Sequence, residues 1–198
     1  MNLTRKGVAL FAFGLGLLSA GDAQAKKTRT VVDRIVAVVD SACITKSALD
    51  RELIPYRKEL GARHGLDADA RKAALEALEK STLRQMIDTR VLVKAAEAAR
   101  FTATVEEVDR AIVEVASSNK RTVKELLAEL PSLGYDEAEY RRSTRQQLMV
   151  ARLVSYETGK RVAGFAKLSP AEQRQKSVAV ERDLVSELRR AVHIEERL

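Results

Sequence analysis

The chain has 198 residues, of which 45% are hydrophobic and 32% are charged, and this composition is typical of one folded domain or a small pair of lobes. Its formal net charge is +7, but it has no tryptophan and only four phenylalanines and four tyrosines, which argues against a surface that stacks single-stranded nucleic acid. One cysteine and two histidines are too few for a four-ligand zinc site, so we expect no metal and no cofactor.

The first 25 residues have the pattern of a secretory signal peptide. Arg5 and Lys6 form a charged start, an apolar run extends from Gly7 to Ala20, and Ala23-Gln24-Ala25 has the small residues of a cleavage site. The apolar run is shorter than the roughly 20 residues that span a membrane, so a retained anchor is the less favoured alternative. We therefore expect an exported protein that is cleaved after Ala25.

The mature chain opens with a segment rich in β-branched residues. Residues 31–39 predict a strand that is covered on both faces, residues 40–42 predict a turn, and Cys43-Ile44 predicts a short return strand. Ser47, with Asp50 three residues later, predicts a capping box at the start of the first helix. A small hairpin followed by a helix is therefore expected.

From Ser47 onward, apolar residues recur at helical spacing almost everywhere. Pro55 predicts a kink or a restart in the first helix. A second helix is expected from about Asp69 or Ala70 to Ala99, with residues 80–82 as the place where it could be interrupted. Its buried stripe is predicted to consist of Leu75, Leu78, Leu83, Met86, Ile87, Val91 and Leu92.

Four later helices begin with a capping side chain that is followed three residues later by glutamate. The pairs are Thr104 with Glu107, Thr122 with Glu125, Asp136 with Glu139, and Ser169 with Glu172. Pro131 is expected to end the second of these helices. Near the C-terminus, Val192 and Ile194 alternate with polar residues and predict a strand, for which residues 31–39 are the available partner. We expect a mainly α fold in which the N-terminal hairpin and the C-terminal strand form one small sheet.

The sequence contains no pattern typical of catalysis, such as GxSxG, HExxH, CxxC or a glycine-rich phosphate loop. Cys43 is expected to be a buried thiol, because no neighbour would activate it as a nucleophile or pair with it. His64 is expected near a helix end and His193 on the outer face of the last strand. Arginines at 141–145 and 189–190 are interleaved with glutamates, which favours a solvated surface over a nucleic-acid site.

Residues 32–53, VDRIVAVVDSACITKSALDREL, closely resemble the opening of the mature SurA-type periplasmic chaperones. The resemblance continues through residues 84–130 and 134–154, and the closing SELRRAVHIEERL is similar to the last helix and strand of the family. The matching motif positions are Ile87, Asp88, Val91, Leu92 and Ala95; Thr104, Glu106, Glu107, Val108, Asp109, Ala111 and Ile112; Thr122, Glu125 and Leu126; and Tyr140 and Arg141.

The resemblance implies a domain arrangement. Residues 26–164 would form the SurA N-terminal-like helical chaperone domain, and residues 171–198 would form a C-terminal helix and strand that pack back on it. Members of the family usually carry one or two parvulin prolyl-isomerase domains before the last helix, whereas residues 165–170 are here a short linker in that place. The parvulin histidine pair is also absent, so no catalytic residue carries over and no isomerase activity is expected. The turn at residues 40–42 departs from the Asn- and Gly-rich turn of the family.

The resemblance also implies a function, that of an ATP-independent holdase in the periplasm. Its partners would be unfolded outer-membrane or secreted polypeptides and the outer-membrane assembly machinery, without nucleic acid and without stable membrane insertion. We hypothesise that the helices from 104 to 154 supply an apolar groove for these clients. The candidate client-binding residues are Leu126, Leu127, Leu130, Leu133, Tyr135, Tyr140 and Met149.

Three alternatives remain open from the sequence. Any one of these seven side chains could instead belong to the core. The chain could be a helical adaptor or structural envelope protein with one fixed partner. It could also be classed as a prolyl isomerase by family while lacking the catalytic domain.

Overall fold

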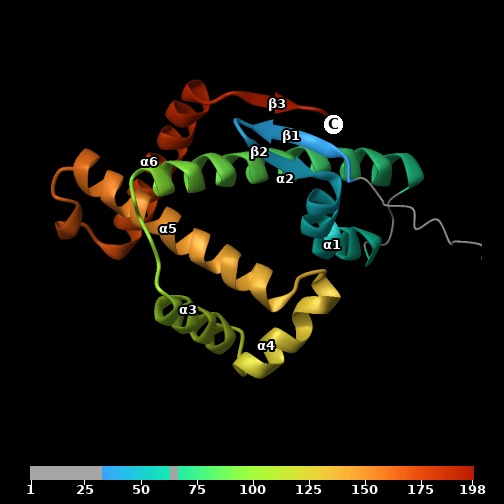
Figure 1. The fold of residues 1–198 in the computed structure, drawn as a ribbon, viewed down its shortest axis with the longest axis horizontal. Coiled ribbons are helices and arrows are strands. Elements are labelled where there is room, and N and C mark those ends of the chain that lie inside the picture. The colour runs from blue at the N-terminus through green and yellow to red at the C-terminus, as the bar shows by residue number, and fades with distance from the viewer. Residues whose placement is uncertain (1–32, 63–66) are drawn as a thin grey trace, which may run out of the picture. The chain divides into compact units, whose positions relative to one another are not determined.

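The computed structural model describes residues 33–62 and 67–198. The expected signal peptide, its cleavage after Ala25, and His64 lie outside these residues. In chain order the elements are β1 (Ile35–Val39), β2 (Ala42–Thr45), α1 (Lys46–Ala62), α2 (Ala68–Ala98), α3 (Val105–Ser118), α4 (Val123–Glu129), the 3₁₀ helix η1 (Leu130–Leu133), α5 (Glu137–Arg161), the 3₁₀ helix η2 (Phe165–Lys167), α6 (Pro170–Ala191) and β3 (Ile194–Glu196). The mainly α fold with one small sheet is confirmed (Figure 1).

The sheet brings the two ends of the described chain together, as predicted. β1 lies in the centre and pairs antiparallel with β2 on one side and with β3 on the other. Within β1, Val36, Ala37 and Val39 are buried in one core cluster, whereas Ile35 and Val38 are only partly buried. The pairing of β1 with β2 is irregular between Ile35 and Ala37, so the side chains do not alternate strictly there. The backbone N–H of Arg197 extends the pairing by donating to the carbonyl of Val36 at 2.8 Å.

Asp40, in the turn between β1 and β2, joins three parts of the fold. It has a positive φ of 51°, and its backbone N–H donates to the carbonyl of His193 at 2.8 Å. Its carboxylate accepts the backbone N–H of His193 at 2.8 Å and pairs with Lys94 of α2. The bond from Lys94, with that from His193, holds the pKa of Asp40 below its ordinary value. One side chain therefore links the hairpin turn, the segment before β3, and α2.

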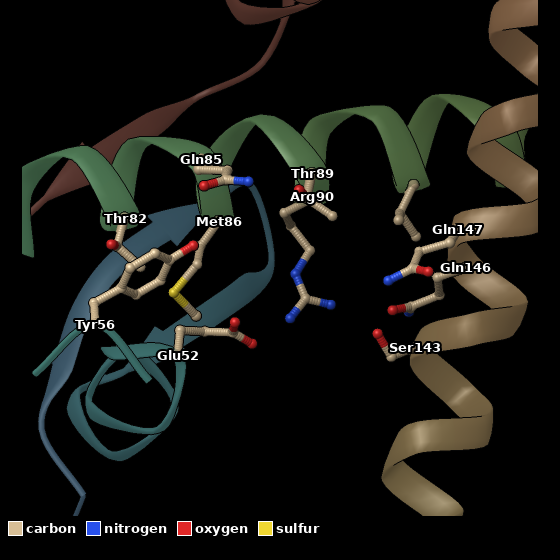
Figure 2. A pocket seen from close by; sticks show the side chains of 11 residues that line it. Glu52, Tyr56, Thr82, Gln85, Met86, Thr89, Arg90, Ser143, Gln146 and Gln147 are labelled. Atoms are coloured by element: carbon tan, nitrogen blue, oxygen red, sulfur yellow. The ribbon is translucent and has the colours of Figure 1, made fainter. Parts of the chain in front are cut away.

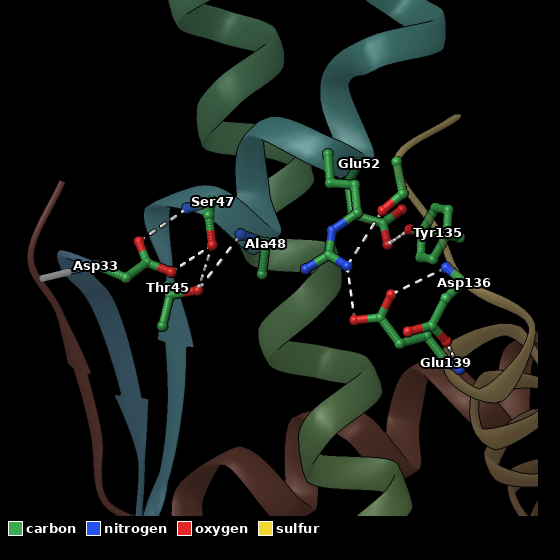
Figure 3. Close-up of polar contacts among 10 residues, drawn as sticks. Asp33, Thr45, Ser47, Ala48, Glu52, Tyr135, Asp136 and Glu139 are labelled. Atoms are coloured by element: carbon green, nitrogen blue, oxygen red, sulfur yellow. Dashed lines mark hydrogen bonds and ion pairs between the residues drawn. The ribbon is translucent and has the colours of Figure 1, made fainter. Parts of the chain in front are cut away.

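The predicted capping box at Ser47 and Asp50 is wrong. The side-chain oxygen of Thr45 caps α1, because it accepts the backbone N–H three residues later at 3.3 Å. Ser47 lies inside the first turn, where its backbone N–H donates to Asp33 at 3.1 Å and its hydroxyl donates to the other oxygen of the same carboxylate (Figure 3). Asp33 precedes β1 and supplies an acceptor from outside the helix, which a local spacing rule does not detect.

Helix α2 has the predicted length but is more regular than predicted. It runs for 31 residues without an interruption at 80–82, and Asp67 caps its start. Leu83, Ile87 and Val91 pack against the sheet and α1 in one core cluster. Leu92 and Ala96 belong to a second cluster with α5 and α6. The remaining predicted stripe residues, Leu75, Leu78 and Met86, are only partly buried.

The other helix boundaries follow the predicted signals. The structure confirms all four later capping boxes, in which the capping side chain and the glutamate each bond the other residue's backbone. α4 ends at Glu129, and the chain continues through Pro131 in η1. α1, in contrast, continues through Pro55.

The expected burial of Cys43 is wrong. Cys43 is exposed, whereas its neighbour Ile44 is 2% exposed. Side chains alternate between the two faces of a strand, and β2 places Ile44 toward the core and Cys43 away from it. His193 is exposed, as predicted.

We expect Asp40→Asn to lower the free energy of unfolding at neutral pH, because asparagine tolerates positive φ but loses the charge that pairs with Lys94. The pKa of Asp40 is lowered in the folded protein, so its ionised carboxylate stabilises the fold above the ordinary value of 3.8. That contribution is lost as pH falls through the folded pKa.

The measurement is urea unfolding of both proteins at about pH 7 and about pH 2. The difference between them should be present at the higher pH and shrink at the lower one. Asp183→Asn, at an exposed position in α6, is the control and should change little. An equal difference at both pH values would show that the charge of Asp40 does not stabilise the fold.

Candidate functional site

A cleft of about 290 Å³ lies between α1, α2 and α5, and we call it the central cleft. Figure 2 shows that its lining side chains approach from all three helices. α1 contributes Glu52 and Tyr56, and α5 contributes Ser143, Gln146 and Gln147. The α2 side is formed by Thr82, Gln85, Met86, Thr89, Arg90 and Val93. The lining is therefore mostly polar, with Met86, Val93 and the ring of Tyr56 as its apolar part.

A second hollow, of about 440 Å³, lies between α2, α5 and α6. We call it the apolar hollow after its four apolar lining residues, Leu92, Val150, Ala151 and Val154. The other described lining residues are polar: Thr89, Gln147, Ser155, Ser177 and Glu181. Thr89 and Gln147 belong to both the central cleft and the apolar hollow, so the two adjoin.

Two further hollows extend this surface at its ends. One is lined by Phe165, Pro170 and Val178, among others, and shares Ser177 with the apolar hollow. The other lies between α1 and the start of α2 and shares Tyr56 with the central cleft. Four neighbouring hollows thus follow one another from α1 along α2 and α5 to α6, and we call this run the α2–α5 surface.

The order of residues on α5 explains why the surface changes from polar to apolar. The buried residues of this helix are Thr144, Met149, Leu153, Val154 and Thr158. Positions 143, 147 and 150 follow helical spacing with the buried Val154 and share one side of the helix. That side begins with serine and glutamine and continues with valine.

The contact between α1 and η1 frames the central cleft. The Arg51 guanidinium donates to Glu139 at 2.7 Å and to the carbonyl of Gly134 at 3.3 Å (Figure 3). It also lies over the ring of Tyr135, at 5.4 Å from its centre, while the Tyr135 hydroxyl donates to Glu52. Since Glu52 also lines the cleft, this contact fixes one of its walls.

The shifts in the pKa values of Tyr135 and Glu139 are consistent with this contact. Burial, together with the bond to Glu52, raises the pKa of the Tyr135 hydroxyl, which therefore remains a donor at neutral pH. The bond from Arg51, with the backbone bond at Asp136, holds the pKa of Glu139 below its ordinary value, so that it remains an anion.

The structure places the seven predicted client-binding residues outside the central cleft and the apolar hollow. Leu130 and Met149 are buried, and Met149 packs in the core cluster that contains Leu92 and Leu153. The other five are half-buried in α4, in η1, in the connection after η1 and at the start of α5: Leu126, Leu127, Leu133, Tyr135 and Tyr140. The central cleft was not predicted from the sequence, because the candidate residues were bulky and apolar. Glutamine, serine and threonine form much of the lining of the cleft.

The described residues contain no group of three or more His, Cys, Asp or Glu side chains that could hold a metal ion. Within the same residues, no helix is both long enough and apolar enough to span a membrane.

We expect Gly134→Ala to lower the free energy of unfolding by about 1–3 kcal/mol. Gly134 has a φ of 77°, and a Cβ there would lie 2.9 Å from Cγ of Arg51, so alanine adds backbone strain and a clash. Gly159→Ala is the matched control, because that glycine is inside α5 with open space around it and should gain about 0.5–1 kcal/mol. Urea unfolding measures both, and changes of the same sign would refute this account of Gly134.

Comparison with known proteins places the chain in a family. The model of the SurA-like N-terminal domain matches residues 6–154. The chain is 29% identical over 157 residues to Chaperone SurA of Sodalis glossinidius and 34% identical over 133 residues to Chaperone SurA of Cupriavidus metallidurans. Chaperone SurA of Legionella pneumophila (strain Lens) is 26% identical over 132 residues.

These alignments cover 77%, 67% and 67% of this chain but only 33%, 26% and 30% of the three relatives. The chain therefore spans about a third or less of the length of the curated relatives that it matches. The match falls on the SurA-like N-terminal domain, as the sequence motifs predicted. Because the family model covers more than half of the chain, this protein belongs to the family that carries the SurA-like N-terminal domain.

Proposed function

We propose that this protein is an ATP-independent chaperone that holds unfolded polypeptide along the α2–α5 surface. The observation that carries the proposal is the run of neighbouring hollows, in which each shares a lining residue with the next. The relatives named Chaperone SurA support the same class of function.

The length of the surface suits an extended segment better than a single side chain. Its lining on α2 runs from Ala74 to Val93. At about 1.5 Å per helical residue this is roughly 28 Å, which equals roughly eight residues of extended chain. A client segment of that length would contact several hollows at once.

The lining also suits reversible binding. Polar and apolar hollows adjoin at Thr89 and Gln147, so a client can place backbone groups in one and a side chain in the next. Contacts of this kind are individually weak and exclude few sequences. A holdase without an energy source needs such contacts, because its clients must leave spontaneously.

We propose that the clients are unfolded outer-membrane or secreted polypeptides in the periplasm, with the outer-membrane assembly machinery as a further partner. The predicted export signal and the family support this location. The half-buried residues of α4, η1, the connection after η1 and the start of α5 remain proposed as a second contact area: Leu126, Leu127, Leu133, Tyr135 and Tyr140. Leu130 and Met149 are assigned to the core, since both are buried.

The proposal does not include prolyl isomerisation. The part of the family that matches is the N-terminal domain, and α5 and α6 are joined by a short segment that contains only η2. A short X-Pro peptide should therefore isomerise at its uncatalysed rate in the presence of the protein.

The direct test is light scattering of a denatured outer-membrane porin diluted into buffer. The protein should suppress aggregation at a near-stoichiometric ratio. Ala151→Glu should require roughly tenfold more protein for the same effect, because it replaces an apolar lining residue with a second carboxylate beside that of Glu181. Ala77→Glu, at an exposed position of α2, makes the same chemical change elsewhere and should behave like the unaltered protein.

Two results would contradict the proposal. Failure of the unaltered protein to slow aggregation would refute the holdase function. Tight binding to one envelope protein without binding to unrelated unfolded porins would indicate the adaptor instead.

A further inference from the structure

Arg90 differs from the other half-buried arginines in the described part of the chain. Five arginines are half-buried in this part of the chain, and the four other than Arg90 each form an ion pair with a carboxylate of another element. The pairs are Arg51 with Glu139, Arg141 with Asp109, Arg152 with Glu107, and Arg189 with Asp88. Arg90 forms no ion pair or hydrogen bond with any described side chain. Removing a guanidinium partly from water without a counter-ion is unfavourable, so this position suits an external anion.

The position of Arg90 makes its charge available to a ligand. Figure 2 shows its guanidinium extending from α2 into the middle of the central cleft, between the side chains of α1 and those of α5. Glu52 is the acidic residue in the lining, and its carboxylate accepts the hydroxyl of Tyr135. Lys94, which lies near Arg90 in an adjoining hollow, is paired with Asp40.

The cleft lining holds further hydrogen-bonding groups that have no partner among the described residues. The amides of Gln85, Gln146 and Gln147 and the hydroxyl of Ser143 line the cleft and bond to no other described residue. Gln173 is different, since its amide donates to two backbone carbonyls at 3.0 and 3.3 Å. The three cleft amides can therefore donate to an anion or pair with a peptide backbone.

We propose that the central cleft binds a carboxylate of the client polypeptide through Arg90, with the glutamine amides bonding the adjacent backbone. This inference rests on the proposed holdase function and names the group that the cleft recognises. A guanidinium matches a carboxylate with two parallel hydrogen bonds. The carboxylate is either the C-terminus of the client or an Asp or Glu side chain, since both have the same chemistry.

The surroundings favour a peptide carboxylate over a phosphate. Arg90 is the single cation among the described lining residues and has Glu52 in the same cleft, whereas phosphate sites usually combine several positive groups or backbone amides. The cleft also adjoins the apolar hollow through Thr89 and Gln147, where the neighbouring client residue would place its side chain.

The test uses the full chain and three fluorescent peptides of one apolar sequence, measured by anisotropy. The first peptide ends in a free carboxylate, the second ends in an amide, and the third ends in an amide but contains an internal aspartate. The unaltered protein should bind the first or the third peptide about tenfold more tightly than the second, as a charge-assisted pair implies. The peptide that is preferred identifies the source of the carboxylate.

Arg90→Gln should abolish this preference, so that the variant binds all three peptides with about the same affinity. Arg84→Gln removes the same charge from an exposed position of α2 and should keep the preference. Arg90→Lys should retain only part of it, because lysine cannot form the parallel pair. Circular dichroism of each variant confirms that the comparison is made between folded proteins.

The inference is overturned if the unaltered protein binds all three peptides equally, or if Arg90→Gln keeps the preference. Either result leaves the holdase function intact, because peptide binding itself persists. If no peptide binds and porin aggregation is not suppressed, both proposals fail together.

Discussion

Helix α2 buries side chains on two sides, and this double burial determines where the other elements can lie. Leu83, Ile87 and Val91 require a cover on one side, which the sheet and α1 provide. Leu92 and Ala96 require a cover on the other, which α5 and α6 provide. Fully burying such side chains contributes about 1.5–3 kcal/mol each, which far exceeds the surface ion pairs at about 0–1 kcal/mol. The chain therefore needs both its N-terminal and its C-terminal parts around this one helix.

The proposed binding surface follows from the same constraint. Where α1 and α5 cover α2 on its two sides, the strip between them stays open and carries Gln85, Thr89 and Arg90. Gln85 and Thr89 are exposed on this strip and cost little while they face water, so the fold can hold an open cleft beside a closed core. The α1–η1 contact through Arg51 then holds the opposite wall in place.

Much of this fold could be predicted from the sequence, because the interactions that begin its helices join residues only a few positions apart. Each of the four later capping boxes involves a side chain and a backbone amide only three residues apart, as at Thr104 and Glu107. The pairing of β1 with β3 could also be predicted, since the alternating C-terminal segment had one available strand partner. Ser47 was misassigned because its actual partner, Asp33, is 14 residues away.

The site was harder to predict than the fold. The wrong expectation for Cys43 came from the usual burial of free cysteines, whereas the face that a residue occupies on an edge strand depends on pairing. The central cleft depends on how α2 and α5 cross, and its polar lining resembles any solvated helix face in sequence. Arg90 has no ion-pair partner among the described side chains, and this depends on tertiary contacts that give partners to the other half-buried arginines.

The central claim is that client polypeptide binds along the α2–α5 surface. Methyl NMR of the valines during titration with an unfolded porin segment tests it most directly. The account predicts that the signals of Val150 and Val154 in the apolar hollow shift with the added segment, while that of Val113, exposed on α3, stays in place. Shifts at Val113 without shifts at Val150 and Val154 would contradict it.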